Sequence, residues 1–311
     1  MQSAKKVIAV LTATGTQGAG VVEELLKDGS FAVRGITRDP ESAKAKALTA
    51  RGVEMVKGDA DDANSLTAAF EGAYGVFANT VWTIFPKEGY DQKKTEERET
   101  QQGKNMVDAA KKAGVQHFVW STLAGISEPW VYHLMSKHKV NSYLAESGIP
   151  VWTLYYTSCY ISNFAKPVIQ FLKKDSDGLF FIDIPVPPDT VIPFFHGGES
   201  GKWVLPMFKD PSKYNGQRVD AVAEFLTPRQ IAETIKRVTG VPVYVKELTV
   251  ERFFEPSYRA SVFDEMWLNC ATWVLKLNNK NAEQSKSIVP SPTTLEEFLK
   301  TDPKTRELLG V

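Results

Sequence analysis

The stretch Val7–Gly18, which reads VIAVLTATGTQG, decides the fold. Its first five residues, Val7–Leu11, form a short apolar run rich in β-branched side chains, which is typical of a buried strand. A glycine-containing turn follows directly, and Gly18–Leu26 places its apolar residues at helical spacing. Gly15 lets the backbone approach a pyrophosphate closely, and Gly18 lets the helix pack tightly against the sheet. Strand, glycine turn and helix in this order predict a dinucleotide-binding site at the helix N-terminus.

One position of this loop departs from the usual pattern. A glycine normally makes the first tight turn after the strand, whereas this chain has Thr12. The loop keeps its function if Thr12 adopts an unstrained backbone. The residues that we expect to contact the cofactor in this loop are Thr12, Thr14, Gly15, Thr16, Gln17 and Gly18.

Strands and helices continue to alternate through the first half of the chain. Apolar β-branched runs predict further strands, and segments of helical periodicity separate them. The predicted strands are 31–37, 53–57, 75–79, 117–121 and 151–155, and the predicted helices are 41–51, 65–70, 94–113 and 130–147. Such alternation with right-handed crossovers predicts an α/β protein with a doubly wound parallel Rossmann sheet, formed by residues 1–155.

The alternation stops after about residue 155. A Pro- and Gly-rich stretch at 182–201 predicts loops and short strands, followed by a strand at 217–223. Thr227 is expected to cap a helix over 227–238, with Pro228 at its first position and Gly240 just past its end. A strand at 243–245 and a helical tail from residue 250 complete the pattern. Residues 156–311 therefore predict a smaller C-terminal α/β lobe, with part of 190–225 returning to the Rossmann domain.

The end of the second predicted strand bears on the choice of cofactor. NAD binders usually place an acidic residue there to bond the ribose 2′-hydroxyl, whereas this chain continues with Arg38 and Asp39. A guanidinium suits a 2′-phosphate, so the sequence favours NADP(H) over NAD(H), although NAD(H) binding stays open. Asp39 is either the acidic residue in a shifted register or a turn and N-cap residue. Asp59, followed by Ala60, either lies near the adenine or caps the next helix.

Composition narrows the class of partner. Lysine plus arginine and aspartate plus glutamate number 37 each, so the chain has no electrostatic footprint for direct nucleic-acid binding or an anionic membrane. No apolar stretch reaches the ~18 residues that span a membrane, and Val7–Leu11 is too short for a signal peptide.

Cys159 and Cys270 have no metal-like spacing and are expected to be reduced thiols. We expect a cytoplasmic or nuclear protein, with protein partners left open. The strongly charged stretch 87–102 is expected to be a solvated loop and helix face.

The order of motifs resembles that of the NmrA-like proteins, which are atypical relatives of the short-chain dehydrogenases/reductases. The resemblance covers nearly the whole chain and rests on TATGTQG at 12–18, VRGITRDP, VKGDADD, HFVWSTLAG, HLMSKHKVNSYLAESGIPVWTL, YISNF, DPSKYNGQRV and LTPRQIAETI. It implies a Rossmann domain and a smaller lobe with a cleft between them. Some regulators of the family similarly lack the first glycine of the loop. Some members bind NADP(H) or NAD without clear turnover and act as redox-sensing regulators through protein partners, whereas others reduce small molecules with NADPH.

The catalytic motif of the relatives is incomplete here. Standard short-chain dehydrogenases use Tyr-x-x-x-Lys, and Lys137 matches that lysine, but His133 stands four residues before it. Tyr132 is one residue off, which rotates it by ~100° around a helix. Lys137 could bind the cofactor ribose without turnover, or serve as the acid/base as in the isoflavone-reductase-like relatives. Alternatively His133 donates the proton, or it is a packed or surface histidine.

Further polar and aromatic residues are expected around the same cleft. Ser121 and Thr122 end a strand where the related enzymes hold a polar group near the substrate carbonyl; a strand-end cap is the alternative. Asn79 and Thr80 are expected on the nicotinamide side. Tyr156 and Asn163 complete the expected cofactor contacts. An aromatic set forms either an apolar substrate pocket or ordinary packing: Trp82, Phe85, Trp130, Tyr156 and Tyr160.

The sequence thus predicts an NADP(H)-binding redox sensor with little or no turnover. The alternative is an NADPH-dependent reductase of a small apolar carbonyl or enone, with Lys137 at its centre and Ser121 and His133 as further catalytic candidates.

Overall fold

The chain folds into two compact units, seen in a computed structural model that describes all residues except 1–3, 83–88, 90, 129 and 167–169. The first unit comprises the described residues of 1–125, 132–157 and 197–221. The second comprises those of 126–131, 158–196 and 222–311. Each unit is described by itself below.

The first unit is built on a parallel sheet. In the described residues this sheet has seven strands in the order β11-β6-β5-β4-β1-β2-β3. The chain winds from β1 outward to β3, returns to β4 beside β1, and winds outward the other way, which confirms the doubly wound Rossmann topology. The strands are β1 (Val7–Leu11), β2 (Ala32–Thr37), β3 (Glu54–Lys57), β4 (Gly75–Ala78), β5 (His117–Thr122), β6 (Val151–Tyr156) and β11 (Gln217–Asp220).

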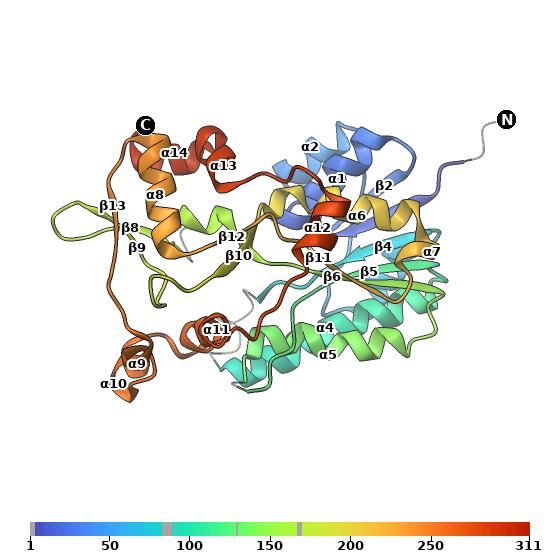
Figure 1. The fold of residues 1–311 in the computed structure, drawn as a ribbon. Helices are drawn as coiled ribbons and strands as arrows, with labels where there is room; N and C mark the ends of the chain where they lie inside the picture. The colour runs from blue at the N-terminus through green and yellow to red at the C-terminus, as the bar shows by residue number, and fades with distance from the viewer. Residues whose placement is uncertain (1–3, 83–88, 90, 129, 167–169) are drawn as a thin grey trace. The chain divides into compact units, whose positions relative to one another are not determined.

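Helices cover both faces of this sheet. Apolar side chains of α3, α4 and α5 form one core cluster with Phe118 and Trp120 of β5, and α4 and α5 lie side by side (Figure 1). On the other face α6 packs against α1, with Trp203 and Phe208 buried. The helices of this unit are α1 (Thr16–Asp28), α2 (Ala43–Thr49), α3 (Ala63–Phe70), α4 (Gln92–Lys112), α5 (Tyr132–Ala145), α6 (Ser200–Lys209) and α7 (Pro211–Tyr214).

Among its described residues the second unit has two small sheets and mainly short helices, as expected for the C-terminal part. Its sheets have the orders β12-β10-β7 and β13-β9-β8. Thr227 caps α8 in a reciprocal capping box with Gln230, and Gly240 ends that helix in the left-handed conformation, so the predicted caps are confirmed. The strands are β7 (Cys159–Tyr160), β8 (Leu172–Lys174), β9 (Phe180–Ile182), β10 (Ile192–Phe195), β12 (Glu224–Leu226) and β13 (Val243–Val245). The helices are α8 (Pro228–Thr239), α9 (Val250–Phe253), α10 (Pro256–Ser261), α11 (Asp264–Val274), α12 (Ala282–Ile288), α13 (Leu295–Thr301) and α14 (Pro303–Leu309).

In the first unit, capping of the next helix was one of two alternatives for Asp59 and for Asp39, and it is wrong for both. Asp59 does not cap the helix after β3, because Asp62 accepts the N–H groups of Asn64 and Ser65 at the start of α3. Asp39 does not cap α2, because Ser42 does. In both places the sequence offers several capping residues within a few positions, and the geometry of the loop selects the one nearest the helix.

Two further observations concern the chain as a whole. Cys159 and Cys270, both in the second unit, form no disulfide. No helix among the described residues is both long and apolar enough to cross a membrane.

Candidate dinucleotide site

The polar residues singled out from the sequence line the carboxyl edge of the first unit's sheet. Because parallel strands end at the same edge, the residues after each strand lie there in the order of the strands. Between β1 and β4 the winding direction reverses, and in doubly wound sheets ligands bind outside such a reversal. In sheet order these residues are Tyr156, Ser121 and Thr122, Asn79 and Thr80, Thr12, Arg38, and Asp59.

The loop after β1 leaves the start of α1 open to an anion. The Gly15 N–H donates to the Thr12 carbonyl at 2.7 Å and closes a tight turn. Gly15 is the N-cap of α1 and has no side chain with which to cap the N–H groups of the first turn. A Cβ atom at Gly18 would lie 2.7 Å from the carbonyl oxygen of Leu11, so only glycine lets the helix approach the strand this closely. These are the features by which a helix N-terminus binds phosphate.

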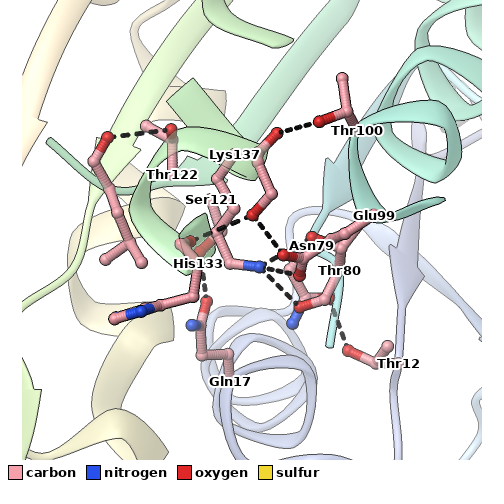
Figure 2. A network of polar contacts seen from close by, with 12 residues as sticks. Thr12, Gln17, Asn79, Thr80, Glu99, Thr100, Ser121, Thr122, His133 and Lys137 are labelled. Carbon is pink, nitrogen blue, oxygen red and sulfur yellow. Dashed lines mark hydrogen bonds and ion pairs between the residues drawn. The ribbon is translucent and has the colours of Figure 1, made fainter. Parts of the chain in front are cut away.

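Thr12 carries the strain of this turn. Its φ is +49°, in the left-handed region that β-branched residues rarely adopt, so the condition of an unstrained backbone at Thr12 is not met. Its Oγ1 donates a hydrogen bond to Asn79 Oδ1 at 2.6 Å, which joins the ends of β1 and β4 at the reversal (Figure 2). The turn geometry that usually demands glycine is therefore retained, and a side-chain bond holds threonine in it.

The end of β2 presents a cation. Arg38 is exposed, and no ion pair joins it to a described carboxylate, whereas Arg34 pairs with Glu54 at 2.8 Å. Asp39 Oδ1 accepts the backbone N–H of Glu41 at 3.0 Å, which matches the turn interpretation of this aspartate. The group left to meet a ligand at this position is a guanidinium, which suits a phosphate rather than a ribose hydroxyl.

The next strand end is held by local bonds. Asp59 Oδ1 accepts the N–H of Asp61 at 3.1 Å, and its own N–H donates to Ser65 Oγ at 3.0 Å. The carbonyl of Ala60 accepts from Asn105 Nδ2 at 2.9 Å. These bonds fix the loop after β3 at the same sheet edge as Arg38.

Lys137 lies in a buried polar network between α4, α5 and the end of β4 (Figure 2). Its Nζ forms an ion pair with Glu99, whose side chain is fully buried, and donates to Thr80 Oγ1 at 2.8 Å. Ser136 Oγ also donates to the Glu99 carboxylate. Glu96, three residues before Glu99, is buried as well, so the expectation of a solvated charged face is wrong for this part of the helix. The carboxylates stay buried because lysines of α5 compensate their charge.

His133 and Ser121 are engaged elsewhere. The His133 ring centroid lies 5.9 Å from that of Trp82, and in Figure 2 the imidazole extends away from the Lys137 ammonium. Ser121 is buried and donates to Gln17 Oε1 at 2.7 Å, which links β5 to α1. Thr122 is fully buried at the end of β5. The structure thus brings Lys137, Thr80 and Asn79 to one region of the sheet edge.

The remaining residues are distributed between the two units. Tyr156 is buried at the end of β6, its hydroxyl accepts from Asn141 Nδ2 at 2.9 Å, and Arg218 lies 4.3 Å from its ring centroid. Asn163, Tyr160 and Trp130 belong to the second unit. Phe85 lies outside the described residues.

Comparison with known proteins identifies the family. The model of the NmrA-like family matches residues 4–299. The chain belongs to the NmrA-like family. It is 30% identical over 255 residues to the NmrA-like family domain-containing oxidoreductase hkm9 of Aspergillus hancockii, covering 77% of this chain and 74% of that protein. Two crystal structures of NmrA, a negative transcriptional regulator, share the fold at a TM-score of 0.78. They are the NAD complex, 23% identical, and the NADP complex, 24% identical, and each covers 99% of this chain and 98% of the other.

Two members of the network were missed by the analysis of the sequence. Glu99 lies in a helix rich in charged residues, and nothing in its local sequence separates a buried carboxylate from its exposed neighbours. Ser136, next to Lys137, drew no attention either. A signal was present in the small Gly103, one helical turn after Glu99, because a glycine inside a helix indicates close packing of a neighbour.

Proposed function

We propose that this NmrA-like protein binds NADP(H) at the carboxyl edge of its sheet, with NAD(H) as the weaker ligand. The uncapped start of α1 would hold the pyrophosphate, Arg38 the 2′-phosphate, and Lys137 the nicotinamide ribose. The bound nicotinamide would supply or accept two electrons. The NAD and NADP complexes of NmrA support binding of both dinucleotides at this fold.

The proposed preference for NADP(H) over NAD(H) rests on the Arg38 guanidinium at the end of β2, which forms no ion pair with a described carboxylate. Replacing Arg38 by alanine is expected to weaken NADPH binding about ten- to a hundred-fold and to leave NADH binding nearly unchanged, because only NADPH carries the 2′-phosphate. Isothermal titration calorimetry with both dinucleotides measures this. Arg51→Ala is the matched control, since Arg51 is an exposed arginine engaged in an ion pair with Glu23. An Arg38→Ala variant that kept the wild-type preference would refute the assignment.

We further propose that the protein is a redox-responsive regulator with little or no turnover, whose partner is another protein. The support is His133 in the tyrosine position, with its imidazole beside Trp82 and directed away from Lys137 (Figure 2). A regulator of this kind must respond differently to NADP⁺ and NADPH, because a ligand shifts an equilibrium only through its differential affinity. Calorimetry with the two forms, and partner capture in the presence of each, tests this. Equal affinity and equal capture would contradict a sensor.

A reductase is the second candidate, and two observations favour it. Curated relatives such as hkm9 are described as oxidoreductases, and Lys137 stands at the sheet edge next to Thr80. The substrate would be a small apolar carbonyl or enone, with Lys137 as the proton donor. A screen of NADPH oxidation with aldehydes, quinones and enones tests this candidate. Robust turnover that Lys137→Ala abolishes would replace the regulator with a reductase.

A further inference from the structure

A fully buried carboxylate stands behind the lysine of the site. Glu99 lies in the middle of α4, and its side chain has no exposed surface. It meets two donors from α5, the Lys137 ammonium and the Ser136 hydroxyl. A carboxylate loses its hydration on burial, and only a paired and hydrogen-bonded one is tolerated. The position of Glu99 and that of Lys137 therefore depend on each other.

The packing of α4 on α5 fixes this pair. Thr100 Oγ1 donates to the Ser136 carbonyl at 3.1 Å, and Trp120 Nε1 donates to the Lys137 carbonyl at 3.2 Å. At Gly103 a Cβ atom would lie 2.6 Å from Val140 Cγ2, so glycine is what allows α5 to approach α4 here. The backbone of Lys137 is thus held from two sides before its side chain makes any contact.

The three N–H bonds of the ammonium all have acceptors on the protein. One meets Glu99, one meets Thr80 Oγ1 at 2.8 Å, and the weakest contact is to the Thr80 carbonyl at 3.4 Å. The first two contacts place the ammonium at the carboxyl end of β4 (Figure 2). This strand lies beside β1, where the winding direction of the sheet reverses. The long third contact is the one that an oxygen of a ligand can replace at the least cost.

A second lysine–glutamate pair on the same two helices offers a comparison. Lys139 Nζ lies 2.5 Å from Glu96 Oε1, and the Glu96 side chain is buried, whereas that of Lys139 is 41% exposed. Lys139 is two residues beyond Lys137, whereas it is Lys137 Nζ that donates to Thr80 Oγ1 at the end of β4. Both pairs thus join a glutamate of α4 to a lysine of α5, and the Lys137 pair in addition contacts Thr80 at the end of β4.

We propose that Glu99 is a positioning residue of the dinucleotide site, which holds the Lys137 ammonium at the end of β4 so that it donates to a ribose hydroxyl of the bound cofactor. The Glu99 carboxylate accepts from both Lys137 and Ser136, and these two bonds fix the position of the lysine. This inference rests on the proposed binding of NADP(H). Glu99 acts through Lys137 and touches no ligand itself.

The first test is a comparison of matched variants by calorimetry with NADPH. Glu99→Gln keeps the size and removes the charge, and is expected to lower NADPH affinity about ten-fold, because the ammonium loses its fixed position. Glu96→Gln, with the same chemical change on the same helix, is expected to stay within about two-fold of wild type. In a Lys137→Met background the Glu99→Gln change is expected to have no further effect. An equal loss in both glutamine variants, or a loss that persists without Lys137, would overturn the proposal.

The second test needs no cofactor. Brief acylation of the folded protein with acetic anhydride, read by mass spectrometry, reports the reactivity of each lysine. Glu99→Gln is expected to accelerate acylation of Lys137 at least about five-fold and to leave Lys139 unchanged, because the Lys137 side chain is then no longer held in the buried network by its ion pair with Glu99. Glu96→Gln is expected to accelerate acylation of Lys139 and to leave that of Lys137 unchanged. Unchanged reactivity of Lys137 in Glu99→Gln would refute the pairing.

Two further outcomes keep the tests distinct. If Glu99→Gln does not fold, as judged by circular dichroism, Ser136→Ala removes only one donor to the carboxylate and is expected to show the same pattern at a smaller size, about two- to three-fold. If this variant matches wild type in both tests, the proposal is wrong. If the wild-type protein does not bind NADPH, the proposed function fails, and the acylation experiment still decides whether Glu99 holds Lys137.

Discussion

Thr12 illustrates how a single residue departs from the usual dinucleotide-binding pattern without loss of the turn. A left-handed backbone costs a residue other than glycine about 1–2 kcal/mol. The hydrogen bond from Thr12 to Asn79 returns about 0.5–1.5 kcal/mol, and glycine would itself lose about 0.5–1 kcal/mol of backbone entropy. The two sides nearly balance, so threonine is tolerated where the turn geometry favours glycine. The sequence reveals the departure, but the compensating Asn79 lies 67 residues away.

His117 gives a prediction for the pH dependence of stability. It is buried at the start of β5 against the Phe208 ring, and burial lowers its pKa from 6.5 to about 4. The unfolded chain therefore takes up this proton first. Stability contributed by neutral His117 is fully present above pH 6.5 and is lost as the pH falls toward 4. Lowering the pH from 7.5 to 5 is expected to cost about 2 kcal/mol through this residue alone.

Urea unfolding at the two pH values, compared between wild type and His117→Gln, isolates that contribution. Glutamine does not titrate and can still bond Thr153, whose hydroxyl lies 3.3 Å from His117 Nε2. His138, whose pKa burial also lowers, is present in both proteins and cancels in the difference. If both proteins lost the same stability between pH 7.5 and 5, the burial argument for His117 would fail.

Among the elements, local signals located strands and helix ends well. The predicted strand at Val243–Val245 has the observed bounds, and Thr227 caps its helix as expected. The first helix begins at Thr16, two residues before its predicted start at Gly18. Such features depend on a few neighbouring residues, so a single sequence contains them. The sequence does not show whether Asp59 or Asp62 caps α3, because an aspartate suits an N-cap at either position and the geometry of the loop decides.

The candidate site could be assembled from the sequence only in part, for the same reason. Lys137 and Arg38 could be proposed as site residues because each stands in a local motif whose chemistry is known. Glu99 was missed, since its partner is 38 residues further along the chain and its helix is strongly charged. A pattern of charges shows neither which carboxylate is buried nor which lysine compensates it; only the pairing of α4 with α5 does.

That pairing supports a prediction about Gly103. A valine here would place its Cβ atom 2.6 Å from Cγ2 of Val140, which is itself fully buried. Gly103→Val is expected to destabilise the protein by about 1–3 kcal/mol and to accelerate acylation of Lys137, because α5 is pushed away from Glu99. Gln101→Val, an exposed position on the same helix, is the control and should change neither quantity. Gly103→Val with wild-type stability in urea would show that α4 and α5 pack less closely than argued.

For the whole molecule, the important feature is that neither unit is a continuous piece of chain. The first unit draws on three segments, and its last, 197–221, supplies α6 and the edge strand β11. β11 pairs with β6, and α6 buries large apolar side chains against α1. The buried side chains are Trp203, Val204, Met207 and Phe208. A sheet that reads as complete by residue 156 therefore depends on residues more than forty positions later.

This dependence predicts how truncated chains behave. A fragment of residues 1–157 lacks β11 and the four buried side chains of α6, worth roughly 1.5–3 kcal/mol each. Their sum approaches the roughly 5–15 kcal/mol by which whole domains are stable. The fragment is therefore expected to show no cooperative thermal unfolding, whereas residues 1–221, which contain every segment of the first unit, should retain a cooperative transition that NADPH shifts upward. Calorimetric scans of both fragments measure this. A cooperative transition in 1–157 would mean that the sheet and its anion-binding helix are stable without the returning segment, and that α6 and β11 are accessories to the cofactor site rather than part of its foundation.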